Sequence, residues 1–491
     1  MKNPLHLLAF DLGASNGRGI LGQFDGERIK LEELHRFENN FIGLGGMLYW
    51  DVLNLYQQMK LAFRAFRQTG QRELAAFGID TWGVDYGLLD RNGRLLGNPR
   101  AYRHTTDADM EAVWKEVPFE TLFRRTGIAT LCFNTVYQLY RRKLEGDVAL
   151  DCAETMLLMP DLLGYFCTGE KASEYTNVTT TMLYNPTAGD WDWETIDALG
   201  LPKHIFTRID RAGQVRGRLL PDLAGELGLN QAVFAAVGTH DTASAVAAIP
   251  GRGNFAFCSS GTWSLFGVET DTPILSSEVR DANFSNEGTV QGGFRPLKNI
   301  MGLWLIQECR RDWKKAGRSC SWDDIVAAAR DASPLRSIID PDAPEFFKAG
   351  DMEQKIQDFC RRTNQPIPEG MGEVARCVYE SLALKYRWAL ERLEEIKGAK
   401  LEALNIVGGG IQNKLLNQMA ADSIDRPVVT GPIEGAAMGN LLSQAMALGE
   451  LNGIEEARQV VRNSEAVETY TPHHTQAWDD AYGRLISFLN P

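Results

Sequence analysis

The amino-acid sequence predicts an α/β protein with two domains, and its length is the first reason. The chain has 491 residues, whereas a single hydrophobic core stops growing at about 250–300 residues. Two stretches, 7–21 and 254–269, share one layout of an apolar strand, a small polar turn and a second strand. Each half of the chain then ends in helices. We therefore expect domains at residues 1–243 and 244–491, with the segment IPGRGN at 249–254 as a hinge.

Short apolar runs and one amphipathic segment set out the first half. Strands are expected at residues 5–10, 19–24, 28–34 and 75–80. A helix is expected over residues 51–68, and the residues of its apolar face are Leu53, Tyr56, Met59, Phe63 and Phe66. Residues 86–97 predict a hairpin, because Asn92-Gly93 is a favoured two-residue turn. Helices are expected to dominate from Thr106 to Phe166.

The second half repeats this start and closes with longer elements. Residues 372–398 predict a long helix that ends at Gly398, a residue suited to the C-terminus of a helix. Its inward positions are Val374, Val378, Leu382, Leu390 and Leu393. Residues 403–422 and 427–449 each predict a strand, a glycine-rich turn and a helix. Such units build a parallel or mixed sheet between helices.

Charge and hydropathy narrow the class of protein. The net charge of −13 at pH 7 argues against non-specific binding to nucleic acid or to an anionic membrane. A single loop can still hold a nucleotide phosphate through backbone N–H groups. The sequence has no apolar run of about 18 residues, so no transmembrane helix is expected. Its first residues lack the layout of a signal peptide, so a cytoplasmic protein is expected.

The eight cysteines are scattered along the chain, and none lies in a CxxC pair. A zinc site is therefore not expected. In the cytoplasm the expected state is reduced, mostly buried thiols. Cys360 and Cys377 could pair with each other, but their spacing leaves that question open.

Four short segments, considered together, indicate a chemical site. They are DLGASNGR at 11–18, GTHDT at 238–242, SSGTW at 259–263 and GGGIQN at 408–413. Taken singly, each has a structural explanation: such turns join hairpins or allow tight packing, and Asp241 could be the N-cap of the helix that follows it. Because all four occur in this order across the two halves, the sequence predicts a two-domain protein that binds phosphate groups.

Asp11 raises a question, because a carboxylate repels a polyphosphate by about 4 kcal/mol at contact distance in a protein-like dielectric. A divalent cation between the two groups removes the conflict, since Mg²⁺ is held by one or two carboxylates together with substrate phosphates. We therefore expect Asp11 to act on hydrated Mg²⁺ while the turn N–H groups and Ser15 hold phosphate oxygens. The alternative is that Asp11 is only a turn residue at the end of a strand.

The segments FDLGASNGRGILG, GIDTWGVDYGLLD, GTHDTASAV, SSGTWSLFG and VGGGIQN resemble the FGGY carbohydrate kinases. The similarity extends from Asp11 to about Asn440. It implies a duplicated actin-like ATPase fold of the ribonuclease H-like type, with ATP and a sugar bound between two domains. Further segments, among them FNTVYQLY and EYTNVTTTMLYNP, resemble family members that act on L-rhamnulose. TGPIEGAAMGN and Ile411 depart from the family pattern, which affects only details of the adenine pocket.

The same resemblance implies a role for individual residues. Asp241 matches the catalytic base. Substrate contacts are implied for Gly83, His240, Asp241, Thr242 and Asn299. Phosphate or nucleotide contacts are implied for Ala14, Ser15, Asn16, Gly17, Arg18, Thr262, Gln307 and Gly409. Three side chains have two interpretations each: Arg18 touches phosphate or pairs with a surface carboxylate, and Trp82 and Trp263 face the sugar or serve packing.

The expected reaction is phosphorylation of L-rhamnulose by ATP with Mg²⁺, as a step of L-rhamnose catabolism. The acceptor is the C1 hydroxyl, because C6 of this 6-deoxy ketose is a methyl group. Asp241 has an ordinary pKa of about 3.9, far below that of an alcohol, so proton transfer should lag behind phosphoryl transfer. Two alternatives stay open: a kinase for L-fuculose, xylulose, ribulose or a polyol, and a non-kinase ATPase of the same fold. A monomer is expected, because no long apolar helix predicts an obligate interface.

Overall fold

The computed structural model describes residues 4–318, 320–473 and 475–489, which fold into two compact units. The first unit extends to Ala248 and also contains Glu269–Pro296 and Gly435–Glu465. The second unit consists of Ile249–Val268, Leu297–Glu434 and the chain from Ala466 onward. The chain therefore first enters the second unit at the start of the IPGRGN segment, and two later pieces of sequence pack with the first unit.

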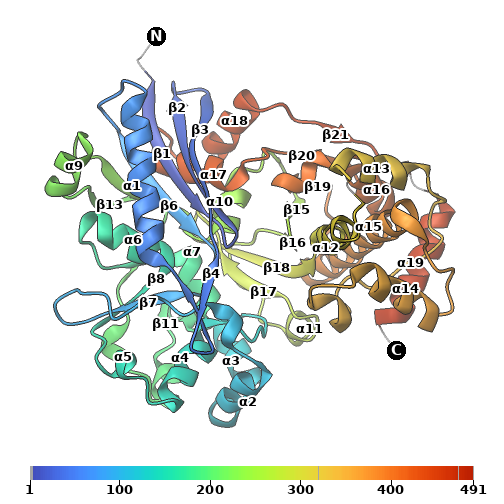
Figure 1. The fold of residues 1–491 in the computed structure, drawn as a ribbon, viewed down its shortest axis with the longest axis horizontal. Coiled ribbons are helices and arrows are strands. Elements are labelled where there is room, and N and C mark those ends of the chain that lie inside the picture. The colour runs from blue at the N-terminus through green and yellow to red at the C-terminus, as the bar shows by residue number, and fades with distance from the viewer. Residues whose placement is uncertain (1–3, 319, 474, 490–491) are drawn as a thin grey trace. The chain divides into compact units, whose positions relative to one another are not determined.

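A six-stranded mixed sheet forms the centre of the first unit (Figure 1). Its strand order is β13-β14-β6-β1-β2-β3. The bounds are β1 (Leu5–Leu12), β2 (Asn16–Phe24), β3 (Ile29–Glu38), β6 (Ala76–Thr81), β13 (Gln214–Arg218) and β14 (Val233–Ala236). β1, β6 and β14 are parallel, whereas β1, β2 and β3 form an antiparallel meander. The four strands predicted from the sequence of this region are confirmed.

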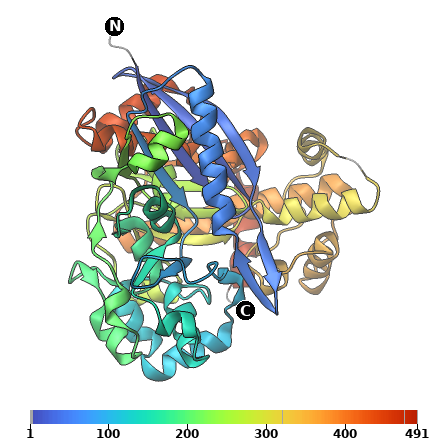
Figure 2. The same ribbon diagram turned by 60° about the vertical axis from the view of Figure 1, so that its left-hand side comes forward.

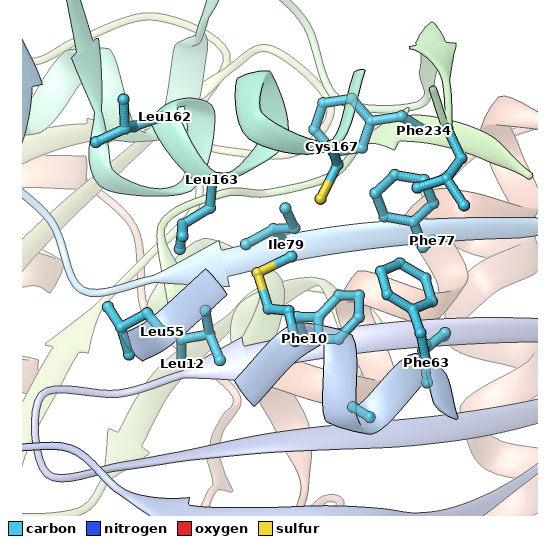
Figure 3. Packing of buried hydrophobic residues seen from close by; sticks show 14 of the residues in the cluster. Phe10, Leu12, Leu55, Phe63, Phe77, Ile79, Leu162, Leu163, Cys167 and Phe234 are labelled. Atoms are coloured by element: carbon cyan, nitrogen blue, oxygen red, sulfur yellow. The ribbon is translucent and has the colours of Figure 1, made fainter. Parts of the chain in front are cut away.

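Different helices cover the two faces of this sheet, in keeping with the alternation of side chains along a strand. Leu8, Phe10 and Leu12 of β1 pack in a core with α1 (Val52–Gln68) and α6 (Met159–Thr168). Figure 3 shows the rings of Phe10 and Phe63 next to each other in this core. They meet edge to face, with centroids 4.9 Å apart. Leu7 and Ala9 pack instead in a core with α17 (Gly435–Ala447). Although α17 comes late in the sequence, it lies against β1 and β6 (Figures 1 and 2).

The helix predicted at 51–68 is confirmed as α1, but one residue of its predicted apolar face is wrong. Asp51 caps it, because its carboxylate accepts the backbone N–H of Asn54 at 3.1 Å. Leu53 is 60% exposed. The buried residues are Val52, Leu55, Met59, Ala62, Phe63 and Phe66. The buried stripe of α1 is therefore centred on the side that carries Val52, Leu55 and Ala62. Leu53 lies outside this stripe.

The hairpin predicted at 86–97 is only partly correct. The turn exists, because the N–H of Asp90 donates to the carbonyl of Arg94 at 2.8 Å and Gly93 has a φ of 75°. However, β7 (Tyr86–Leu89) pairs along its length with β8 (Thr155–Leu158), which interrupts the predicted helical stretch. β8 consists of four consecutive buried residues. In so short an apolar run, the hydrophobic pattern of a strand cannot be distinguished from that of a helix.

Smaller elements complete the first unit. Its other helices are α2 (Asp107–Glu116), α3 (Phe119–Thr126), α4 (Thr135–Leu144), α5 (Val148–Asp151), α7 (Tyr175–Val178), α8 (Trp193–Ala198), α9 (Pro221–Leu227), α10 (Asp241–Ala247), α11 (Ser277–Asp281) and α18 (Ile454–Ser464). Three further strand pairs are β4 (Phe41–Leu44) with β5 (Met47–Trp50), β9 (Ser173–Glu174) with β12 (Ile209–Asp210), and β10 (Tyr184–Asn185) with β11 (Asp190–Trp191). β17 (Ser285–Gly288) is a neighbour of β18 (Phe294–Met301), whose first residues also belong to this unit.

The second unit is built on the strand order β18-β16-β15-β19-β20-β21. Its strands are β15 (Phe255–Ser260), β16 (Trp263–Gly267), β19 (Ala403–Val407), β20 (Val428–Thr430) and β21 (Thr469–Tyr470), together with β18. Its helices are α12 (Trp304–Lys315), α13 (Trp322–Asp331), α14 (Met352–Arg362), α15 (Gly370–Lys397), α16 (Lys414–Ile424) and α19 (Gln476–Leu489). The long predicted helix is confirmed as α15: its five predicted inward residues are buried, and Gly398 ends it with a φ of 66°.

The two units repeat one strand pattern, and this confirms the predicted duplicated fold. In each, three antiparallel strands lead into parallel strands: β3-β2-β1 then β6 and β14 in the first, β18-β16-β15 then β19 and β20 in the second. The first hairpin of each repeat holds one of the predicted phosphate turns. All eight cysteines are free thiols, and six of them, including Cys360 and Cys377, are buried. No helix within the described residues is long and apolar enough to cross a membrane.

Candidate active site

Three acidic side chains of the first unit meet where its parallel strands end. Asp11 and Asp80 are register partners on β1 and β6. The next strand along ends beside them, because the N–H of Thr81 donates to the carbonyl of Thr239 at 2.9 Å. That contact places His240 and Asp241 at the same edge. The carboxyl ends of parallel strands are where ligands bind in α/β sheets, so the structure brings Asp11, Asp80 and Asp241 to one place.

Asp80 is fully buried, and helix α17 supplies its partner. Nδ2 of Asn440 donates to its Oδ2 at 2.6 Å, while its Oδ1 has no hydrogen-bond partner among the described residues. Burial raises the pKa of Asp80 well above its ordinary value, and the negative charge of Asp11 raises it further. The helix comes this close because two glycines leave room for it. A Cβ on Gly439 would lie 1.8 Å from the carbonyl oxygen of Ser244, and a Cβ on Gly78 would lie 2.6 Å from Oδ1 of Asn440.

The first predicted phosphate loop is the turn between β1 and β2. Asn39 braces it from behind, with its N–H donating to the carbonyl of Ser15 at 3.0 Å and its Nδ2 to the carbonyl of Gly13 at 2.9 Å. Ser15 and Asn16 are exposed and Ala14 is half-buried. Gly17 lies already within β2, where a Cβ would be 2.2 Å from the ring of Phe37. Packing alone therefore requires a glycine at 17, and contacts of this loop with phosphate stay predictions.

Arg18 pairs with Asp11, its cross-strand partner on β1. This supports the pairing of Arg18 with a carboxylate over its contact with phosphate. The carboxylate is buried and lies at the site, whereas a surface carboxylate was expected. The donor set fits a hydrated Mg²⁺: two neighbouring carboxylates, one of which, Asp80, carries a buried oxygen without a hydrogen-bond partner in the described part of the chain. No group of three or more His, Cys, Asp or Glu side chains in the described chain could hold a metal ion by itself. The remaining ligands would have to be water and substrate phosphate.

The triplet His240-Asp241-Thr242 opens the short helix α10. His240 is the N-cap, with an extended backbone and a carbonyl that accepts the N–H of Ala243 at 2.7 Å. The alternative interpretation, in which Asp241 is the N-cap, is therefore wrong, because Asp241 is the first residue of the helix itself. Its Oδ1 accepts the N–H and the hydroxyl of Thr242 at 2.5 and 3.1 Å. Burial and the charge of Asp11 raise the pKa of Asp241, while His240 acts in the opposite direction.

Gly83 stands in a strained turn at the end of β6. A Cβ on Gly83 would lie 3.1 Å from Oγ1 of Thr180, and that same oxygen accepts the N–H of Val84 at 3.2 Å. Val84 has a φ of 70°, which is rare for a β-branched residue. Such strain persists where the surroundings hold it, and it is concentrated at functional sites. The geometry supports a working role for this turn, while the sugar contact of Gly83 stays a prediction.

Asp85 holds the same turn together from inside the protein. Its Oδ2 accepts Nε1–H of Trp50 at 2.6 Å and Nε1–H of Trp82 at 2.9 Å, and its Oδ1 accepts Nε2–H of Gln138 at 3.1 Å. Burial raises the pKa of Asp85 to about 7 in spite of these donors. Trp82 is buried in the core of the first unit. This favours its packing role over contact with a sugar.

The titration of Asp85 should appear in the stability of the protein. The unfolded carboxyl has a pKa of about 3.9, so between pH 4 and 7 the folded chain holds a proton that the unfolded chain has released. The free energy of unfolding should therefore fall as the pH rises through this range, by at most about 1.4 kcal/mol per pH unit from this group. Urea unfolding of wild type and Asp85→Asn at several pH values isolates the effect. Parallel curves for the two proteins would contradict it.

The second unit gathers a different group of predicted residues around the turn between β15 and β16. Oγ1 of Thr262 donates to Oε1 of Gln307 on α12 at 3.3 Å. The N–H of Trp304 also donates to the carbonyl of Thr262 at 3.1 Å, so the start of α12 rests on this turn. The glycine turn after β19 lies against the same strand, because a Cβ on Gly410 would be 2.0 Å from Oγ of Ser260. Thr262, Gln307 and Gly409 thus belong to one region of the second unit.

Asn299 lies apart from that turn, in the middle of β18. Its register partner is Leu265 of β16, whereas Trp263, next to Thr262, pairs with Met301. Oδ1 of Asn299 is buried and has no hydrogen-bond partner among the described residues. An unsatisfied amide oxygen needs a partner, and a sugar hydroxyl would supply one. The predicted sugar contact of Asn299 stays a prediction with this support.

The glycine turn offers a matched pair of substitutions. A Cβ on Gly409 meets no atom within 4 Å, whereas one on Gly410 would lie 2.6 Å from Cβ of Ser260. We expect Gly410→Ala to lower the free energy of unfolding by about 1–3 kcal/mol through overpacking. Gly409→Ala should fold normally and raise the KM for ATP by about tenfold, or 1.4 kcal/mol, if the nucleotide lies in the open space. An unchanged KM in Gly409→Ala would remove this glycine from the nucleotide site.

Sequence reasoning missed several residues of this region. Asp80 could have been predicted from the sequence, because it ends an apolar strand in the same way as Asp11 does. Asn440 and Asp85 could not, since their roles depend on partners distant in the sequence. The segment around Asn440 had been noted only as a loose match to the family. In the structure this segment forms the start of α17, and its small residues let the helix pack closely against β1 and β6.

Comparison with known proteins adds the wider context. Models of the N-terminal and C-terminal domains of the FGGY family of carbohydrate kinases match residues 6–248 and 256–448. The rhamnulokinase of Bacteroides thetaiotaomicron is 42% identical over 488 residues, which cover 99% of this chain and 99% of that protein. The rhamnulokinase of Halalkalibacterium halodurans is 42% identical over 464 residues, with coverages of 94% and 98%.

Solved structures show a similar fold at low sequence identity. A ligand-bound xylulose kinase from Lactobacillus acidophilus matches with a TM-score of 0.82 and 17% identity, over 99% of this chain and 98% of that one. A glycerol kinase from Plasmodium falciparum with ADP matches with a TM-score of 0.77 and 13% identity, over 98% of each chain. These likenesses concern the fold alone.

Proposed function

This chain belongs to the FGGY family of carbohydrate kinases, and on that premise we propose that it transfers the γ-phosphoryl group of ATP to the C1 hydroxyl of L-rhamnulose. The products are L-rhamnulose 1-phosphate and ADP, and the reaction serves the catabolism of L-rhamnose. The rhamnulokinases that are 39–42% identical over 93–99% of their own lengths support this choice of sugar. We further propose that the enzyme acts in the cytoplasm as a monomer.

The placement of Asp241 is the observation that carries the reaction. Its carboxylate is half-buried at the end of the parallel strands, beside Asp11 and Asp80. A carboxylate whose pKa is raised is a better proton acceptor at neutral pH than an ordinary aspartate. Asp241 therefore orients the C1 hydroxyl and takes its proton as the bond to phosphorus forms. His240, Thr242, Gly83 and Asn299 are the proposed contacts of the sugar.

The phosphate groups are proposed to lie against the first hairpin turns of the two repeats. In-line phosphoryl transfer depends above all on positioning and on neutralising charge. We propose that the loop at residues 14–18 holds phosphate oxygens through backbone N–H groups of its turn and the hydroxyl of Ser15, and that Thr262 supplies a second hydroxyl. Gln307 and Gly409 are the proposed contacts of the nucleotide. Arg18 is held at this edge by Asp11.

A magnesium ion is proposed to bind at Asp11, with Asp80 beside it. When bound, Mg²⁺ supplies positive charge to the phosphate oxygens, and this removes the repulsion between Asp11 and a polyphosphate. Burial is the main reason why the pKa values of Asp80 and Asp241 are raised, and the negative charge of Asp11 adds to it, so a bound cation would relieve the repulsion among these carboxylates. Asp11→Asn should raise the Mg²⁺ concentration needed for half-maximal activity.

A coupled assay of ADP release tests the proposed function. Mg-ATP is supplied with L-rhamnulose, L-fuculose, xylulose, ribulose and a series of polyols, and with no sugar. We expect L-rhamnulose to give the highest kcat/KM and to raise ATP turnover well above the no-sugar rate. ³¹P and ¹³C NMR of the product should place the phosphate on C1. A higher kcat/KM for another sugar would change the substrate only, whereas equal turnover with and without every sugar would refute a sugar kinase.

A further inference from the structure

A buried hairpin brings a second carboxylate to the ring of His240. Oε2 of Glu287 on β17 lies 3.2 Å from Nδ1 of His240. On the other side of the ring, Nε2 lies 3.5 Å from Oδ1 of Asp241. His240 is therefore placed between the proposed base and a carboxylate that the sequence did not single out. Glu287 is not one of the proposed contacts of the sugar or the nucleotide, so any part it has in the reaction is indirect.

Arg295 on β18 holds this carboxylate in position. Its Nη2 lies 3.0 Å from Oε2 of Glu287 and 3.3 Å from Nδ1 of His240. The two residues face each other across a turn, which is closed by the N–H of Thr289 donating to the carbonyl of Gly293 at 2.9 Å. Burial raises the pKa of Glu287, but His240 and Arg295 outweigh it, so that the pKa of Glu287 is lowered and the group is ionised.

This arrangement is costly for stability, which argues for a functional reason. The side chain of Arg295 is 0% exposed and that of Glu287 is 10% exposed. Nε and Nη1 of Arg295 have no hydrogen-bond partner among the described residues. A buried ion pair seldom stabilises a protein more than apolar residues would, and unsatisfied donors make the balance worse. The chain nevertheless keeps this pair directly behind the proposed catalytic aspartate.

The chemistry of the pair constrains the imidazole. An ionised carboxylate can only accept hydrogen bonds and a guanidinium can only donate them, so Glu287 and Arg295 offer Nδ1 one partner of each kind. These two contacts at Nδ1 fix the orientation of the ring and with it the direction of Nε2. Nε2 is thereby directed at Asp241. The backbone of His240 is held as well, because its N–H donates to Oγ1 of Thr176 at 3.2 Å.

We propose that Glu287 is a positioning residue for the phosphoryl transfer: oriented by Arg295, it fixes the ring orientation of His240 and, through that ring, the position of the Asp241 carboxylate. The inference rests on the proposed function and deepens it. It assigns a role to Glu287 and Arg295 of the hairpin β17–β18, of which the predicted site contained only Asn299. It also predicts that Glu287 acts on the rate of the chemical step and only through His240.

The test is a double-mutant cycle with full kinetics. Glu287→Gln keeps the size of the side chain and removes its charge, and we expect kcat to fall about 10–100-fold because of misplacement at the reacting centre. The KM values for L-rhamnulose and ATP should change by less than about threefold, because Glu287 is not among the proposed contacts of either substrate. In a His240→Asn background the same substitution should lower kcat by no more than about twofold. Glu380→Gln is the matched control, since Glu380 is also a buried carboxylate paired with an arginine, Arg376.

Each outcome decides the proposal. A folded Glu287→Gln enzyme with wild-type kcat would overturn it, and so would an equal loss in the presence and absence of His240, since Glu287 would then not act through that ring. If Glu287→Gln does not fold, Glu287→Met/Arg295→Met replaces the whole ion pair by apolar groups of similar size; it should fold and show the same loss of kcat, and wild-type kcat in it would overturn the proposal. A wild-type enzyme without sugar-dependent ADP release would refute the proposed function first, and this inference with it.

Discussion

Asp241→Asn should abolish nearly all sugar phosphorylation while the protein folds normally. We expect kcat to fall about 10²–10⁴-fold, the usual contribution of a general base. The amide keeps the size of the carboxylate and can still accept the N–H of Thr242, so α10 should form as before. The KM for L-rhamnulose should change much less than kcat, because Asp241 serves the transfer step more than binding. Steady-state ADP release and circular dichroism together test this.

Asp222→Asn is the matched control for that experiment. Asp222 stands in the first turn of α9, which has seven residues like α10, but it is exposed. Loss of its charge should cost about 0.3–1 kcal/mol of helix stability and leave kcat unchanged. An Asp241→Asn enzyme with more than a tenth of wild-type kcat would show that another group accepts the proton. The role of Asp241 would then be reduced to orienting the hydroxyl.

Gly439→Ala should destabilise the first unit and impair activity together. The added methyl would lie 1.8 Å from the carbonyl oxygen of Ser244, a backbone atom that cannot rotate away. Helices α10 and α17 must then move apart, at a cost of about 1–3 kcal/mol or more. Because α10 begins at Asp241 and α17 carries Asn440, the partner of Asp80, the same movement disturbs the acidic edge. Urea unfolding and ADP release measure the two effects.

Gly225→Ala provides the contrast. Gly225 also lies within a helix, α9, but a Cβ there meets no atom within 4 Å. Alanine is a better helix former than glycine, so this variant should be more stable than wild type by about 0.5–1 kcal/mol. Its activity should match that of wild type. Equal stabilities of the two variants would mean that α10 and α17 are not in close contact.

Much of the fold was predictable because its signals are local. Apolar runs with polar ends marked β1, β2, β3 and β6, and a long amphipathic repeat ending in Gly398 marked α15. The turn at Asn92-Gly93 was also predicted, because its sequence preference lies in two residues. Prediction failed where a partner was required. The strand that pairs with β7 is β8, which comes about 70 residues later and has no periodic signal of its own.

The candidate site divides in the same way. Asp11 and Asp241 were predicted from the sequence, Asp11 because it ends an apolar strand beside a small polar turn and Asp241 because GTHDT resembles the family motif. Asp85 was missed, since its function depends on Trp50, Trp82 and Gln138 meeting around one carboxylate. Leu53 was wrongly placed on the inner face of α1, because the sequence shows a helical period but not which of two adjacent stripes faces the sheet.

The sequence by itself determined the repeated strand–turn–strand starts, the turns that are predicted to bind phosphate, the acidic strand ends and the family. These features are encoded in residues that are neighbours along the chain, so local sterics and the alternation of side chains suffice to reveal them. Only the tertiary structure decided that Asn440 meets Asp80, 360 residues away, and that Glu287 stands behind His240. Such contacts arise when distant segments exclude water together, and the packing geometry that selects one partner over another is not written in any single segment.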